Sequence, residues 1–325
     1  MLNVILYTYE GCEACDEVRH ELQRLQAEYP HRLYEVDVTH QDAFHNHRAR
    51  LPMIEIGHYH LEAPFSLEAL QITLRAAWEQ AQKAGSKPFS PPEVSRADRI
   101  LFSFTRHYVL VLNLILALYG GVPFLAPLFM KAGLTLPARM IYAFYAPFCH
   151  QLAFRSWFLF GEQAYYPLEA ARIPGVKTFE AISGLRQVSD PWSPERLQAR
   201  AFVGNEQVGY KVALCERDVA IYGSMLLFGL LFARFRNRLR PLPLLWWVVL
   251  GLLPIGLDGF SQLFSQYSFA WLSSFLPYRE STPFLRTLTG FLFGFLTAWV
   301  IFPALEPSMR ETERLFLRKF ALSGK

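Results

Sequence analysis

Cysteine is scarce in this sequence, where Cys12, Cys15, Cys149 and Cys215 are the four that occur in 325 residues. Four cysteines are too few for a disulfide scaffold in a chain of this length, and two of them form a Cys-x-x-Cys pair. A basic leader with an apolar core and a cleavage site is also lacking, because Met1–Thr8 is typical of a short β-strand. We therefore expect the N-terminal region to stay in the reducing cytoplasm.

Charged residues are also few, at 18% of the sequence, whereas 52% of the residues are hydrophobic and 28 are phenylalanine. Residues 1–87 carry thirteen acidic and eight basic side chains, while residues 88–325 carry fifteen acidic and twenty-four basic ones. The basic excess borders apolar runs, which indicates membrane flanks and argues against nucleic acid as a partner. The composition predicts an acidic water-exposed domain joined to a basic body that membrane lipids surround.

Residues 1–84 alternate between strand-like and helix-like patterns. In chain order the patterns predict a strand over 2–9, a helix over about 13–29, a strand over 33–38, a short helix over 41–49, strands over 51–56 and 59–61, and a helix from Ser66 to about Gln82. This β-α-β-α-β-β-α order defines an α/β domain. The composition of residues 85–98 predicts a linker to the rest of the chain.

The Cys-x-x-Cys pair lies where the first strand meets the first helix. At a helix N-terminus, free backbone N–H groups and the helix dipole stabilise the thiolate of Cys12, and Cys15 is one turn away and can resolve a mixed disulfide. Four acidic residues surround the pair: Glu10, Glu13, Asp16 and Glu17. Their charge opposes thiolate formation and disfavours glutathione, so we expect a protein disulfide or thiol as the partner. A non-catalytic binding module and a metal-binding pair are the alternatives.

The element order, the pattern over Tyr7–Glu17 and the proline that opens the third strand resemble the thioredoxin fold. Within that fold the segment is most similar to the small glutaredoxin-like proteins, and the resemblance covers all of residues 1–84. It implies thiol–disulfide exchange at Cys12 and Cys15. It also implies that Pro52 is cis and faces the dithiol.

Residues 99–310 contain apolar runs that approach the roughly 20 residues needed to cross a bilayer. The runs cover 108–130, 136–160, 219–232, 242–257 and 284–305. The second run is interrupted by prolines and polar residues, and the segment 161–214 is a polar excursion. The residues of the other four runs are nearly all apolar, so we expect each to form a span.

Arginines orient these runs. Four alternate between the third and fourth runs, at Arg234, Arg236, Arg238 and Arg240, and the tail over 311–325 is also basic. Both features indicate the cytoplasmic side of a plasma membrane, where the N-terminal domain is expected too. We therefore predict an all-α multi-pass domain with four spans and a re-entrant or interfacial half-helix over Leu136–Phe160; five spans are the alternative.

Polar residues gather at the ends of neighbouring apolar runs. Because consecutive spans return the chain to the same face, these residues should meet on one side of the membrane. They are Cys215, Arg217, Asp218, Asp258, Gln262, Arg279, Glu280 and Arg286, joined from the interrupted run by Cys149, His150, Gln151 and Arg155. Arg217 with Asp258, and Arg286 with Glu280, are the expected buried ion pairs.

The same motifs carry a second resemblance, over about residues 108–305, to an uncharacterised prokaryotic integral-membrane family. The matching motifs are Cys149-His150-Gln151, Arg155–Phe158, Cys215-x-Arg217, Leu257-Asp258-Gly259 with Gln262, and Arg279–Thr282. The family usually has Cys-x-Arg-Cys where this chain has Cys215–Asp218, and it lacks most of the 161–214 excursion. The resemblance names relatives without naming a reaction.

Four chemical interpretations of the polar residues stay open. Cys149, His150, Cys215 and Asp218 form a ligand set that suits zinc or another borderline metal. The residues could instead form a structural network that joins helix ends. In a third interpretation Cys149 and Cys215 form a disulfide that exchanges with the N-terminal domain.

The fourth interpretation is a site for an anionic lipid head group or phosphate, held by Arg217, Arg279 and Arg286. Taken together, the sequence favours a membrane-anchored thiol–disulfide oxidoreductase. The alternative is a transporter or a metal- or anionic-lipid-binding membrane protein, in which the N-terminal domain is a sensor or a docking module.

Overall fold

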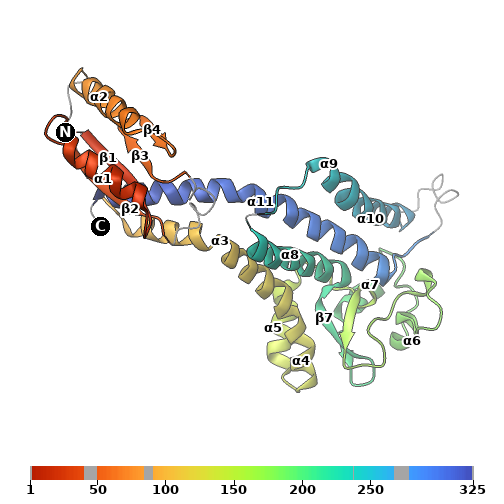
Figure 1. The fold of residues 1–325 in the computed structure, drawn as a ribbon. Helices are drawn as coiled ribbons and strands as arrows, with labels where there is room; N and C mark the ends of the chain where they lie inside the picture. Colours follow the sequence, from red (N-terminus) through yellow and green to blue (C-terminus); the bar gives the residue numbers. More distant parts are fainter. Residues whose placement is uncertain (1, 40–49, 84–90, 237, 267–277, 324–325) are drawn as a thin grey trace. The chain divides into compact units, whose positions relative to one another are not determined.

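The computed structural model describes the chain except for residues 1, 40–49, 84–90, 237, 267–277 and 324–325. It contains two compact units (Figure 1). The first unit comprises Met1–Tyr108 with Leu305–Lys325, and the second comprises Val109–Ala304. The second unit holds the polar residues that the sequence singles out in the membrane body.

A four-stranded mixed sheet forms the centre of the first unit. Its strands are β1 (Leu2–Thr8), β2 (His31–Asp37), β3 (Met53–Ile56) and β4 (Tyr59–Glu62), in the order β2-β1-β3-β4. The strand β1 is parallel to β2 and antiparallel to β3, which is antiparallel to β4. The helices are α1 (Glu13–Leu25) and α2 (Leu67–Lys83). The helix expected over 41–49 lies outside the described residues.

Both faces of this sheet are buried. In β1 the side chains of Val4 and Leu6 pack with buried residues of α1 and α2. The alternate side chains, Ile5 and Tyr7, pack on the opposite face with residues from the end of α11 (Pro283–Ser323). A strand that is covered on both faces is apolar at nearly every position, as β1 is. The basic tail expected over 311–325 is therefore helical to Ser323 and packs against the sheet.

Four described helices are long and apolar enough to cross a membrane. They cover Arg96–Lys131, Glu216–Phe235, Leu244–Gln266 and Pro283–Ser323. The first consists of α3 (Arg96–Gly121), the 3-10 turn η2 (Val122–Phe124) and α4 (Leu125–Lys131), and the second is α8. The third consists of α9 (Leu244–Trp246), the π-helical η5 (Trp247–Leu252) and α10 (Leu253–Gln266). Because Pro254 has no N–H to donate, the α-helical pattern is interrupted near it.

In the second unit, α11 lies between α8 and α10 (Figure 1). Gly290 and Gly294 form the contact with α8: a Cβ at Gly290 would lie 2.7 Å from the carbonyl oxygen of Arg217, and a Cβ at Gly294 would overlap Ile221 and Ser224. Small residues four positions apart allow two membrane helices to approach this closely. The sequence analysis did not identify this pair, although its Gly-x-x-x-Gly spacing is visible in the sequence.

The interrupted run is not the long helix that the sequence predicted. The helix α5 covers only Thr135–Tyr145 and is followed by a turn, the 3-10 turn η3 (Ala153–Arg155) and the strand β5 (Ser156–Leu159). Pro147 has no N–H to donate to a helix, and Gln151 has a φ of 51°, which a helix excludes. The expectation of a helix through Phe160 is therefore wrong beyond Tyr145.

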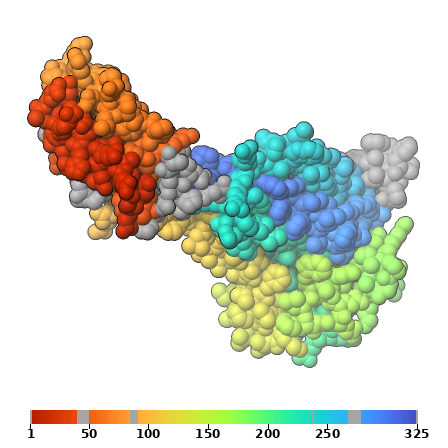
Figure 2. Space-filling model, in the orientation of Figure 1, coloured from red at the N-terminus to blue at the C-terminus, as the bar shows by residue number. Residues whose placement is uncertain are grey.

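The second unit also contains an antiparallel sheet, which corrects the all-α prediction for the membrane body. Its strands are β5, β6 (Gly204–Asn205) and β7 (Gly209–Cys215), in the order β5-β7-β6. Around it lie the 3-10 turn η4 (Glu169–Ala171) and two short helices, α6 (Phe179–Ser183) and α7 (Pro194–Ala201). The excursion over 161–214 has a buried core that includes Tyr166 and Phe179. Figure 2 shows its green atoms packed beside those of α4 and α5, in yellow.

Candidate functional site

Two buried carboxylates organise the polar residues at one end of the helices of the second unit. The side chain of Asp258, in α10, is 2% exposed. It pairs with Arg217 of α8 and accepts a hydrogen bond of 2.7 Å from Arg279, and the single Ser281 hydroxyl, 2.9 and 2.8 Å from its two oxygens, donates to it. The ion pair between Arg217 and Asp258 that the sequence suggested is therefore present.

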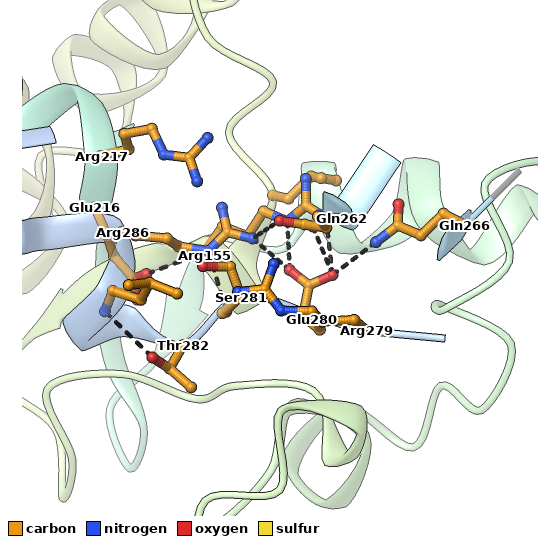
Figure 3. A network of polar contacts seen from close by, with 12 residues as sticks. Arg155, Glu216, Arg217, Gln262, Gln266, Arg279, Glu280, Ser281, Thr282 and Arg286 are labelled. Carbon is orange, nitrogen blue, oxygen red and sulfur yellow. Dashed lines mark hydrogen bonds and ion pairs between the residues drawn. The ribbon is translucent and has the colours of Figure 1, made fainter. Parts of the chain in front are cut away.

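The second carboxylate, Glu280, precedes α11 and accepts bonds from three separate parts of the chain (Figure 3). Arg155 donates two bonds of 2.8 and 2.9 Å, and Gln262 and Gln266 of α10 donate one of 2.9 Å each. Arg286 of α11 forms the other expected ion pair. Burial alone would raise the pKa of Glu280, but the charges of Arg155 and Arg286 outweigh burial and hold the pKa below its usual value.

A third buried acid, Glu216, lies at the start of α8 and was not among the predicted site residues. It is 1% exposed, and Arg286 approaches it at 3.9 Å. Neither of its carboxylate oxygens has a hydrogen-bond partner in the described part of the chain. Its position beside Arg217, at the beginning of an apolar run, is the sequence signal that could have identified it.

The predicted metal ligands come together only in part. The Sγ atoms of Cys149 and Cys215 and a carboxylate oxygen of Asp218 lie within 4.8 Å of one another. Cys215 caps α8 and accepts a bond from the backbone N–H of Asp218, while Cys149 Sγ accepts one of 3.3 Å from the N–H of Cys215. Both cysteines are free thiols. His150 is exposed and is not part of this group among the described residues.

The two thiols differ in acidity. A hydrogen bond from Cys215 lowers the pKa of Cys149, and the same interaction, together with burial, raises the pKa of Cys215 well above its usual value.

Gln151 connects α5 to β7 through hydrogen bonds. Its side-chain amide donates to the carbonyl oxygens of Tyr142 in α5 and Ala213 in β7, at 2.9 and 3.0 Å. Its own carbonyl accepts a bond of 2.8 Å from Lys211. Lys211 is 1% exposed, and burial lowers its pKa to about 7. These contacts hold β7 against the segment after α5, and the sequence analysis did not identify Lys211.

A cavity of about 730 Å³ adjoins the two carboxylate networks. Five arginines line it, Arg155, Arg196, Arg200, Arg217 and Arg286, together with His150. The described residues that line it include Gln262 and Gln266, but no aspartate or glutamate. Asp258 and Glu280 are not among these lining residues, whereas Arg155, Arg217 and Arg286, which pair with them, are. The described part of the cavity wall therefore presents donors and positive charge and no carboxylate.

The dithiol in the first unit is separate from this cluster. Cys12 caps the N-terminus of α1 and forms a disulfide with Cys15, with their Cα atoms 5.2 Å apart. Cys12 is 4% exposed. The Leu51–Pro52 peptide bond is cis, and the next residue, Met53, pairs with Tyr7 at the end of β1 that leads to Cys12. The start of β3 and the dithiol thus lie at the same end of the sheet.

The apolar spans and the polar groups buried at their ends define an integral membrane protein. Residues 196–300 match a family described as predicted membrane protein (DUF2085). The chain is also similar to an uncharacterized protein of Methanocaldococcus jannaschii, with 26% identity over 205 residues that cover 61% of this chain and 92% of the relative. No solved structure matches the chain significantly. These similarities support an integral-membrane family and describe no reaction.

Proposed function

We propose that the chain is a membrane-anchored thiol–disulfide oxidoreductase that acts through Cys12 and Cys15. The observation that carries the proposal is the pairing of these residues across the first turn of α1, directly after β1, in a sheet with the order β2-β1-β3-β4. A proline that opens the neighbouring strand lies at the same end of the sheet. This arrangement is the one that the resemblance to glutaredoxin-like proteins of the thioredoxin fold implies.

The exchange runs through a mixed disulfide. In the reduced dithiol the Cys12 thiolate attacks one sulfur of the partner disulfide, forms a Cys12–partner bond, and releases the other partner sulfur as a thiolate. Cys15 then loses its proton and attacks Cys12 Sγ, which forms the Cys12–Cys15 disulfide and releases the second partner thiol. Two electrons pass from the dithiol to the partner.

Two features set the conditions for this exchange. Acidic residues at 10, 13, 16 and 17 oppose the thiolate, and they also repel anionic substrates such as glutathione. Cys12 is almost fully buried in the disulfide form, which limits the access of small molecules to its sulfur. Both features favour a protein partner that supplies binding contacts of its own.

The number of spans determines on which side of the membrane the disulfide partner of Cys12 and Cys15 lies. An even number of crossings puts the N-terminal domain on the same side as the C-terminal end, and the arginine-rich loop after α8 supports the cytoplasm as that side. The cluster around Asp258 and Glu280, after an odd number of crossings, then faces the opposite side. We therefore propose a cytoplasmic disulfide as the substrate and no direct relay to Cys149 and Cys215.

The test is reduction of insulin by dithiothreitol in the presence of the full chain in detergent micelles. Wild type accelerates the precipitation of insulin, and Cys12→Ser abolishes the acceleration because the attacking thiolate is gone. Cys15→Ser accumulates a mixed disulfide that mass spectrometry detects. Cys215→Ser is the matched control and retains the wild-type rate. Equal rates for wild type and Cys12→Ser would end the oxidoreductase proposal.

A second candidate function is metal binding, because Cys149, Cys215 and Asp218 bring three ligand atoms within 4.8 Å of one another. Two thiolates and a carboxylate suit Zn²⁺, which takes a fourth ligand from water in open sites. Backbone N–H groups donate to both sulfurs, and a bound cation would favour the thiolate of Cys215 against the interaction with Cys149 and the burial that raise its pKa. This candidate uses no residue of the N-terminal domain.

Metal content measures this candidate directly. We expect protein purified without chelators to contain about one zinc per chain, and Cys215→Ala to contain none. His150→Ala is the control that keeps its zinc, because His150 lies outside the ligand group. Elemental mass spectrometry of the three proteins decides the question. Wild type without metal would exclude the site.

A further inference from the structure

The cavity beside the carboxylate networks has the composition of an anion site. Among the described residues, five arginines and a histidine line it and no acidic residue does. Guanidinium groups present planar, paired N–H donors that match the oxygens of a phosphate, and they stay charged at every physiological pH. A cavity of this kind favours a ligand that carries at least one negative charge and several acceptor oxygens.

The three buried acids nearby, Asp258, Glu280 and Glu216, are outnumbered by the four arginines that approach them, which are Arg155, Arg217, Arg279 and Arg286. Glu280 already accepts five hydrogen bonds, from Arg155, Arg286, Gln262 and Gln266. Asp258 is likewise shared by two arginines and Ser281. A carboxylate offers about four acceptor positions, so neither acid has capacity for a further arginine.

Two more arginines come from α7. Arg200 donates to the carbonyl oxygen of Ala146 at 2.8 Å, and Arg196 lies over the ring of Phe154, 5.8 Å from its centroid. Neither of these contacts involves a carboxylate. Arg196 and Arg200 line the cavity together with Arg155, Arg217 and Arg286.

The cavity also has an apolar margin. Trp192 is 80% exposed, Leu197 on α7 is 69% exposed, and Leu263 on the third candidate span is 45% exposed. Exposed leucines on a spanning helix face hydrocarbon, and tryptophan is typical of the boundary between the membrane and water. Cationic and apolar surfaces thus adjoin at one opening.

We propose that this cavity binds a phosphate group, carried either by the head group of an anionic lipid or by a free phosphorylated solute. The arginines of α7 and the start of α8 supply the donors, and the apolar margin accommodates an acyl chain where the ligand is a lipid. The site is independent of the dithiol, since every lining residue belongs to the second unit.

The experiment measures the fluorescence of Trp192 in the full chain. The variant Trp192→Phe shows which part of the fluorescence signal comes from this residue. In detergent micelles the probes are inorganic phosphate and glycerol 3-phosphate, added at constant ionic strength with chloride as the competitor. In nanodiscs the probes are phosphatidylcholine alone and phosphatidylcholine mixed with brominated phosphatidylglycerol, whose bromine quenches a nearby tryptophan.

The test variant is Arg196→Gln with Arg200→Gln, which leaves the pairs to Asp258 and Glu280 in place. Arg186→Gln is the matched control, because Arg186 is an exposed arginine of the same excursion that does not line the cavity. We expect the double variant to weaken phosphate binding at least about tenfold, because each arginine donates a charge-assisted hydrogen bond. We expect Arg186→Gln to bind as wild type does. If the glutamine variant does not fold, Arg196→Lys with Arg200→Lys replaces it as the test variant, because lysine keeps the positive charge but not the paired donors of arginine.

The two arms identify the source of the phosphate. Saturable binding of a soluble phosphate in micelles, lost in the double variant, supports a free solute. Quenching by brominated phosphatidylglycerol beyond the phosphatidylcholine baseline, lost in the same variant, supports a lipid. Wild type that responds to none of the probes, or a folded double variant that responds as wild type does, would overturn the proposal.

Discussion

Replacing Glu280 with alanine is expected to lower the free energy of unfolding by about 3–5 kcal/mol, the cost of removing one partner from a buried ion pair. Glu280 is 2% exposed in its side chain and is the shared acceptor of Arg155 and Arg286. Its removal leaves two guanidinium groups near each other without the carboxylate that both of them bind. Thermal and denaturant unfolding in detergent micelles measure the loss.

The pH dependence of this effect has a definite sign. Arg155 and Arg286 lower the pKa of Glu280 in the folded state, so the stability it contributes is fully present above the unfolded pKa of about 4.3 and is lost as pH falls through the lower folded value. The difference between wild type and Glu280→Ala should therefore narrow in acid. Glu206→Ala, at an exposed position, is the control and changes stability little. A loss that stayed constant down to the folded pKa would contradict the ion-pair explanation.

The polar ends of the spans were predictable because charge within an apolar run is costly. Arg217, Asp258, Glu280 and Arg286 each lie where such a run begins or ends, and alternate crossings bring those ends together. Both ion pairs could therefore be predicted residue by residue. The roles of Gln262 and Gln266 as donors to Glu280 could not be predicted, because side-chain direction at a helix end depends on the packing of the next segment.

The segment from Pro147 to Cys215 was predictable only in its polarity. Its apolar residues show neither helical nor strand periodicity, since they belong to short elements that meet through long-range contacts. Neighbours in sequence also separate in space: Cys149 is buried beside Cys215, while His150 is exposed at the cavity. The predicted ligand set included both Cys149 and His150 because they are adjacent in sequence, but His150 lies outside the group of ligand atoms.

In the N-terminal domain the strands could be predicted from their own residues. The segment that packs on the second face of the sheet could not. The apolar pattern of β1 requires burial on both faces, and α1 and α2 account for one face. The other face is covered by Leu317, Ala321 and Leu322, which lie about 300 residues further along the chain. Positive charge in the 311–325 tail indicated its side of the membrane, but its apolar residues, mixed with charged ones, gave no sign of this contact.

The contact between α8 and α11 yields the second large effect. Gly294→Leu is expected to destabilise the protein by about 3 kcal/mol or more, and Gly294→Ala by about 1–3 kcal/mol, because each inserts atoms into a filled space. A Cβ at Gly294 would overlap the carbonyl oxygen of Ile221 and the hydroxyl of Ser224, and Gly290 one turn earlier has the backbone of Arg217 as its neighbour. Backbone atoms cannot rotate away as a side chain can, so the two helices must separate.

Gly223→Ala is the matched control, because a Cβ there meets nothing within 4 Å and Gly223 lies on α8 itself. Alanine favours a helix over glycine by about 1 kcal/mol, so this variant should be neutral or slightly stabilising while Gly294→Ala is destabilising. Separation of α8 from α11 would also move Arg217 and Glu216 relative to Arg286, which ties the glycine contact to the polar cluster. Unfolding measurements report the loss of stability, and the phosphate-dependent fluorescence of Trp192 reports the displacement of the polar cluster. Equal stability of Gly294→Ala and Gly223→Ala would show that α8 and α11 do not approach this closely.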